Sequence, residues 1–91
     1  MNTTDFIKLC KDAVVDYFNN RADKTDNILI SDEDVFVVWY CKTLQNNKAL
    51  LSTIVPDGMY YEITYNGDKK EAYVDAYKKW ENVVVKSVEA E

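Results

Sequence analysis

The stretch "DVFVVWYCKT", Asp34 to Thr43, decides how the fold must be built, because its middle seven residues are all apolar. A β-strand points successive side chains to opposite faces, so a strand with one wet face alternates apolar and polar residues. That alternation is missing here. We therefore expect one face to join the core and the other to be covered by a helix, by a second copy of the chain or by a partner.

Two more strands are expected after this one. The ranges Val35–Thr43, Lys48–Val55 and Met59–Tyr65 are rich in Val, Ile, Tyr and Trp, the residues that favour strands. "VPDGM" is typical of a tight turn, and "LQNNK" of a hairpin connection. Consecutive strands with such short connections form an antiparallel meander.

Helical spacing of apolar residues appears on both sides of the strands. "TTDFIKLCKDAVVDYFNN" predicts a helix near Thr4–Asn20, and "NGDKKEAYVDAYKKWENVVVK" predicts a second one near Asp68–Val85. Asp68 is the expected N-cap of the second helix, with Glu71 three residues later as in a capping box. The second apolar stripe comprises Tyr73, Ala76, Tyr77, Trp80, Val83 and Val84.

The expected fold is therefore α+β, in the order α-β-β-β-α, with a three-stranded antiparallel meander packed against two amphipathic helices. We expect a single domain over residues 1–91, with a loop at residues 19–27 and with frayed ends at residues 1–3 and 87–91.

The hairpin between the second and third strands predicts which face the helices cover. A three-residue loop after Val55 pairs Val55 with Met59, and it places Thr53 opposite Tyr61. The remaining face of the third strand is more polar. The face under the helices is then Leu51, Val55, Met59, Tyr61 and Ile63.

The first hairpin leaves two alternatives open. With a loop of two or four residues, Phe36, Val38 and Tyr40 join the helix-covered face. The alternate residues of the strand, which are Val35, Val37, Trp39 and Cys41, then lie on the opposite face. A loop with an odd number of residues exchanges the two groups.

Either register leaves apolar side chains on the sheet face that the helices do not cover. Tryptophan and tyrosine are favoured at the centres of protein interfaces. We therefore predict that this face binds a partner. The predicted partner-binding residues are Val37, Trp39, Leu50, Ile54, Tyr60 and Glu62.

Composition argues against several classes of function. The formal net charge of −5 disfavours binding to nucleic acid, which requires clustered Lys and Arg. No apolar run approaches the length of a membrane span. The chain has no histidine and no nucleophile–base pair, so we expect no enzyme, and we assign no catalytic, cofactor-binding or metal-binding residue.

The two cysteines, Cys10 and Cys41, are expected to be reduced, buried and non-catalytic. A nucleophilic cysteine would need a partner base, and the usual one is histidine. The acidic run Asp32–Asp34 is interpreted as a solvated turn, because adjacent residues do not converge on a cation.

The phrases "WYCKTLQNNKALLST" and "VPDGMYYEITYNGD" resemble a family of small proteins of unknown function that phages and prophages of Gram-positive bacteria encode. The resemblance extends to the N-terminal "FIKLCKDAVVDYF". It implies a cytoplasmic protein of the bacterial host cell, and it supplies no catalytic residue.

The function expected on these grounds is binding to a bacterial host protein, as an inhibitor or modulator in host takeover or anti-defence. A homodimer through the exposed sheet face is a second expected association. The alternative is a small-ligand binding protein, for a nucleotide or metabolite, that acts as a dimer.

Overall fold

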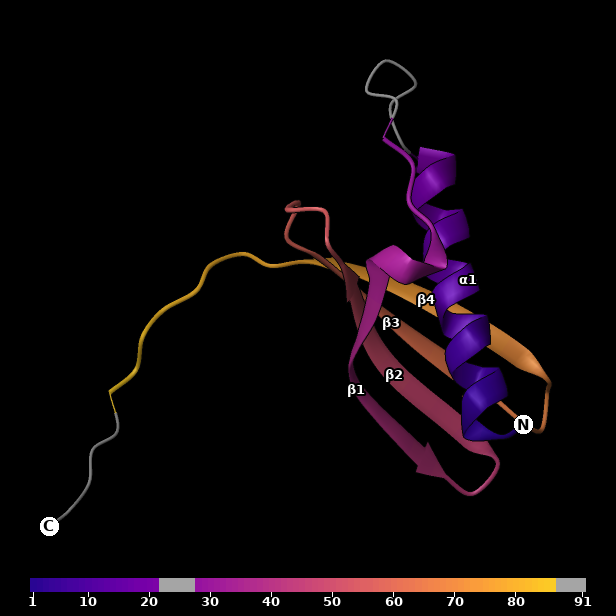
Figure 1. The fold of residues 1–91 in the computed structure, drawn as a ribbon. Helices are drawn as coiled ribbons and strands as arrows, with labels where there is room; N and C mark the ends of the chain where they lie inside the picture. Colours follow the sequence, from indigo (N-terminus) through magenta and orange to yellow (C-terminus); the bar gives the residue numbers. More distant parts are fainter. Residues whose placement is uncertain (22–27, 87–91) are drawn as a thin grey trace, which may run out of the picture.

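The computed structural model describes residues 1–21 and 28–86 (Figure 1). A long helix comes first, then a single 3-10 turn, then four strands in chain order. The elements are α1 (Thr3–Arg21), η1 (Asp32–Asp34), β1 (Val35–Thr43), β2 (Asn46–Thr53), β3 (Met59–Asn66) and β4 (Glu71–Lys78).

The strands form one antiparallel sheet in the order β1-β2-β3-β4. Helix α1 packs across one face of it, and the opposite face carries no other described element (Figure 1). The core lies between α1 and the sheet. Its buried apolar residues are Phe6, Cys10, Val14, Ile30, Val35, Ala49, Leu51, Tyr61 and Ile63.

Helix α1 forms where the sequence predicts a helix. Asn2 caps its start, since its side-chain oxygen accepts a hydrogen bond of 2.8 Å from the backbone N–H of Asp5. Phe6, Cys10 and Val14 recur every four residues, so they share one side of the helix, and all three are fully buried. The apolar stripe thus fixes which side of α1 meets the sheet.

A β-bulge in β1 accounts for the unbroken apolar run at residues 35–41. Val37 lies opposite Leu51, but Trp39 lies opposite Leu50, so Val38 is an extra residue in the ladder. Opposite residues share a face, so Val37 faces α1 and Trp39 faces away from it. Neither register predicted from loop length is right along the whole strand, because a bulge reverses the alternation part-way.

The second hairpin differs from the prediction in register but not in faces. Leu51 lies opposite Tyr61, and Ala49 opposite Ile63, which is a slip of two residues from the predicted pairing. The connection is longer than three residues because β2 ends at Thr53. A slip of two returns every side chain to its predicted face.

The predicted order α-β-β-β-α, with two helices, is wrong. Residues 71–78 form strand β4, paired with β3 over its whole length, and residues 79–86 continue without regular structure. Within β4, Ala72, Val74 and Ala76 alternate with larger or charged residues, and this period of two competes with the helical stripe. The pairing offered by β3 decides the competition.

A tight hairpin replaces the predicted helix start. Asp68 is not an N-cap: its carboxylate accepts a hydrogen bond of 2.7 Å from Gln45 Nε2. The Asn66 side-chain oxygen accepts from the backbone of Asp68 at 3.0 Å, the Asx-turn pattern, and Lys70 has φ of +54°. The chain therefore reverses here instead of entering a helix.

The predicted ends and loop are only partly described. Helix α1 continues to Arg21, so the loop predicted from residue 19 begins later, and Thr3 is already helical. Residues 22–27 of that loop, and the tail predicted to fray at residues 87–91, lie outside the described residues. The single-domain assignment stays a prediction.

Candidate functional site: a hollow on the open face of the sheet

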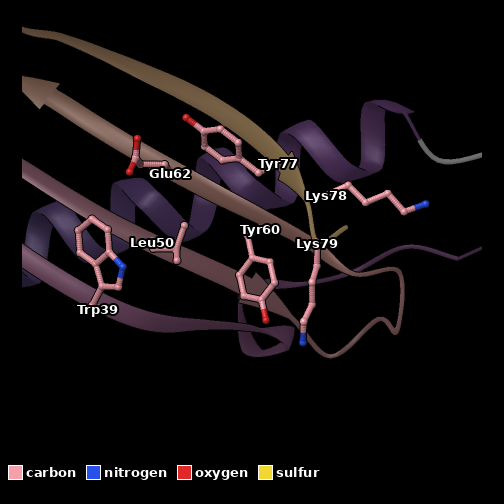
Figure 2. A pocket seen from close by; sticks show the side chains of 7 residues that line it. All are labelled: Trp39, Leu50, Tyr60, Glu62, Tyr77, Lys78 and Lys79. Carbon is pink, nitrogen blue, oxygen red and sulfur yellow. The ribbon is translucent and has the colours of Figure 1, made fainter. Parts of the chain in front are cut away.

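The sheet face opposite α1, called the open face below, carries a hollow of about 430 Å³ (Figure 2). Aromatic side chains from β1, β3 and β4 surround an aliphatic floor, and charged residues lie at its ends. The lining residues are Trp39, Leu50, Tyr60, Glu62, Tyr77, Lys78 and Lys79.

Strand pairing explains why these side chains meet. Trp39 lies opposite Leu50, and Leu50 opposite Glu62, so one row crosses three strands on the open face. Tyr60 lies opposite Tyr77, which sets a second row one step along the sheet. Residues directly opposite in an antiparallel pair share a face and lie within side-chain contact. The hollow is the space between these two rows.

Trp39 separates this hollow from a second one of about 470 Å³ on the same face. The second hollow is lined by the strand ends around Cys41, Lys48 and Thr64, among others. The Trp39 side chain remains 41% exposed between the two. An aromatic ring in that position offers a contact surface to both hollows.

Opposite charges mark the two ends of the first hollow. Glu62 forms an ion pair with Lys48, with 3.4 Å between Oε1 and Nζ. At the other end the Lys79 side chain extends beside Tyr60 (Figure 2). A bound group therefore meets an ion-paired carboxylate at one end, aromatic rings in the middle and a lysine at the other end.

Four of the six residues predicted from the sequence line this hollow: Trp39, Leu50, Tyr60 and Glu62. Val37 does not lie on the open face, because the bulge turns it toward α1, where it packs against the core. Ile54 follows the end of β2, is 68% exposed and does not line the hollow.

Three lining residues were missed, namely Tyr77, Lys78 and Lys79. All three lie in the segment that the sequence assigned to a helix. The signal that could have located them is "NG" at residues 66–67, the dipeptide most typical of tight hairpins. Interpreted as a hairpin, this dipeptide would have predicted a fourth strand, and with it these residues, beside β3.

A family of unknown function, DUF6275, has a model that matches residues 7–87. The chain belongs to this family. No curated protein and no solved structure matches the chain. The DUF6275 match includes all four strands and most of α1, so it covers every residue that lines the hollow.

The two thiols of this DUF6275 protein differ from the prediction in one respect. Cys10 lies on the buried side of α1, and burial raises the pKa of its thiol to about 12, so it stays protonated at neutral pH. Cys41 is exposed, not buried, because its place in β1 turns it to the open face. Both are free thiols.

Within residues 1–21 and 28–86, no group of three or more His, Cys, Asp or Glu side chains is arranged to hold a metal ion. Over the same residues, no helix combines the length and apolar character that a membrane crossing needs. Asp34 of the acidic run instead serves the local turn, where its carboxylate accepts a hydrogen bond of 3.0 Å from the backbone N–H of Ser31.

Proposed function

We propose that this DUF6275 protein is a non-enzymatic binding protein whose open face takes up a segment of another protein. The observation that carries the proposal is the hollow walled by Trp39, Tyr60 and Tyr77, on a sheet face that no other described element covers. Interface centres are enriched in these residue types, which bury much area at little conformational cost.

The residues that line the hollow indicate which side chains the partner segment carries. The floor at Leu50 and the surrounding rings fit one large apolar side chain. Glu62 at one end favours a basic neighbour of that anchor, and Lys79 at the other end favours an acidic one. The expected partner segment therefore carries an apolar anchor between residues of opposite charge.

The proposed setting is a bacterium that carries a phage or prophage. The resemblance to small phage-encoded proteins motivates it. In that setting the partner is a protein of the bacterial host, located in the cytoplasm, and binding acts by blocking that protein in host takeover or anti-defence.

The test compares two tryptophans that differ in position. The immobilised chain is used to capture proteins from a Gram-positive host lysate, and the captured protein is then purified and titrated. Trp39→Ala is expected to weaken its binding by roughly 30-fold or more, which corresponds to about 2 kcal/mol. Trp80→Ala is the matched control, because Trp80 is 95% exposed and does not line the hollow.

Two variants of the charged end sharpen the result. Glu62→Lys reverses the acidic end and is expected to weaken binding, whereas Glu62→Gln is expected to have the smaller effect. Circular dichroism must show that Trp39→Ala remains folded. A folded Trp39→Ala that binds as well as the wild type, or a loss that follows Trp80→Ala instead, contradicts the proposal.

A second candidate function is small-ligand binding, which the volume of the hollow favours. About 430 Å³ lies within the range of small-molecule sites, roughly 300–1,000 Å³. A nucleotide or metabolite with a planar ring would stack between Trp39 and Tyr60. A shift of thermal midpoint with such a ligand, absent in Trp39→Ala, would support this candidate over protein binding.

A further inference from the structure

Strand β4 forms an unusually open edge of the sheet. All eight of its residues are exposed, and all eight pair with β3 without interruption. The other edge strand, β1, carries the bulge at Val38, which is a common protection against edge-to-edge pairing. β4 has neither a bulge nor a proline.

Backbone N–H and C=O groups of successive β4 residues point alternately toward β3 and out of the edge. Lys79 N donates to Gly58 O at 2.8 Å, which continues the β3–β4 ladder by one pair. Hydrogen-bonded and non-hydrogen-bonded pairs alternate along an antiparallel ladder. The N–H and C=O groups of Tyr73, Asp75 and Tyr77 therefore point toward β3, and those of Ala72, Val74 and Ala76 point out of the edge.

We propose that β4 is a dimer interface, at which a second copy of the chain adds its own β4 in antiparallel orientation, centred on Val74. In this register Val74 lies opposite Val74 of the second copy, and Ala72 lies opposite Ala76. Each of these pairs has outward backbone groups, so the two strands form about six hydrogen bonds. The two sheets become one sheet of eight strands.

Charge selects this register over its neighbours. Centring on Asp75 would place two carboxylates opposite each other, and centring on Tyr73 would place Glu71 opposite Asp75; like charges directly opposite destabilise a pair. Centring on Val74 instead places Tyr73 opposite Asp75 and Glu71 opposite Tyr77. No like charges within β4 face each other directly in that arrangement.

Side chains on the helix side favour the same register. Val74 lies opposite the buried Ile63, so it is on the α1 side of the sheet, yet it is 37% exposed because α1 lies over β1 and β2. Ala72 and Ala76 flank it on that side. In the dimer the two small apolar strips join across the two-fold axis, and the valines cover each other.

The described part of the chain leaves the edge accessible. The segment that follows β4, residues 79–86, leads away from the sheet instead of folding back along β4 (Figure 1). This interface also differs from the open-face hollow, so partner binding and dimer formation are separable by mutation.

The test measures mass and register on the full chain. Sedimentation equilibrium is expected to give twice the 10.6 kDa of one chain. Val74→Pro removes an outward N–H at an edge, where proline is tolerated, and is expected to yield a folded monomer. Val74→Thr keeps the N–H and the branched shape, so it is the matched control and stays dimeric.

Cysteine pairs then test the register. In a Cys41→Ser background, Val74→Cys is expected to form a disulfide between copies, because facing Cα atoms lie about 5.5 Å apart. Ala76→Cys is the control: its two copies are offset by four residues, roughly 13 Å along the strands, which is too far for a bond.

Three results would overturn the proposal. The first is a monomeric wild type at high concentration. The second is a dimer unaffected by Val74→Pro and dissociated by Trp39→Glu, which would place the contact on the open face. The third is efficient disulfide formation by Ala76→Cys and none by Val74→Cys.

Discussion

Deleting the bulge residue Val38 is expected to leave the fold intact. Without it, Val37 remains opposite Leu51 and Trp39 remains opposite Leu50, so every side chain of β1 keeps its face and the ladder becomes regular. Val38 is 46% exposed, so the deletion removes roughly half of a valine's burial, about 1 kcal/mol. We expect the free energy of unfolding to fall by no more than about 1.5 kcal/mol.

Deleting Cys41, three residues further along the same strand, provides the contrast. The connection between β1 and β2 has only two residues, 44–45, so it cannot compensate for the deletion. Tyr40 therefore moves to the open face, and Trp39 moves into the core beside Phe6. The buried Asn47 then loses the hydroxyl that donates to it at 2.8 Å. An orphaned buried amide and an overpacked core together are expected to cost at least about 3 kcal/mol.

Urea denaturation followed by far-ultraviolet circular dichroism measures both deletions against the wild type. A Val38 deletion as destabilising as that of Cys41 would show that Val37 and Trp39 do not lie on opposite faces across a bulge. A small effect of the Cys41 deletion would show the same.

Three further predictions concern single side chains. Iodoacetamide at pH 8 is expected to modify one thiol of the native protein, that of exposed Cys41, and to reach Cys10 only in denaturant, as peptide mass spectrometry would show. Burial raises the pKa of Cys10 from 9.0 to about 12, so its contribution to stability is complete below pH 9 and is lost as the pH rises toward 12; at pH 10 the wild type should lose on the order of 1 kcal/mol of unfolding free energy that Cys10→Ala does not lose. Tyr40→Phe removes the hydroxyl bonded to buried Asn47 and is expected to cost about 1–3 kcal/mol in urea denaturation, against less than about 0.5 kcal/mol for the control Tyr60→Phe on the open face.

The N-terminal helix and the first three strands follow from local signals in the sequence. The spacing of Phe6, Cys10 and Val14 specifies one buried side of a helix, and the turn at Gly58, with φ of +72°, specifies where β2 must reverse. These features depend on a few neighbouring residues, which is why the sequence is sufficient to predict them.

The spacing of apolar residues alone could not predict the fourth strand, because its sequence satisfies two periods. Tyr73, Ala76, Tyr77 and Trp80 lie at helical spacing, while Ala72, Val74 and Ala76 alternate along a strand. Pairing with β3 decides between them, and this pairing cannot be inferred from the periodicity of residues 71–78 alone. The bulge at Val38 is likewise defined only by the pairing of β1 with β2.

Errors in register and in strand count affect the predicted open-face residues and the predicted sheet edge differently. Side chains alternate with a period of two, so a register slip of two residues between β2 and β3 left Leu50, Tyr60 and Glu62 on their predicted face. The face that a side chain occupies depends only on whether the register shift is even or odd. An even error in the predicted loop length therefore leaves every side chain on its predicted face. The identity of the edge strand depends on the number of strands, so that number must be predicted correctly. With three strands the open edge would be β3, whereas with four it is β4. The residue at the centre of the proposed dimer is then Val74. The two cysteine variants therefore test the strand count as well as the interface, because a disulfide at Val74 and none at Ala76 is the pattern expected of two β4 strands paired about Val74.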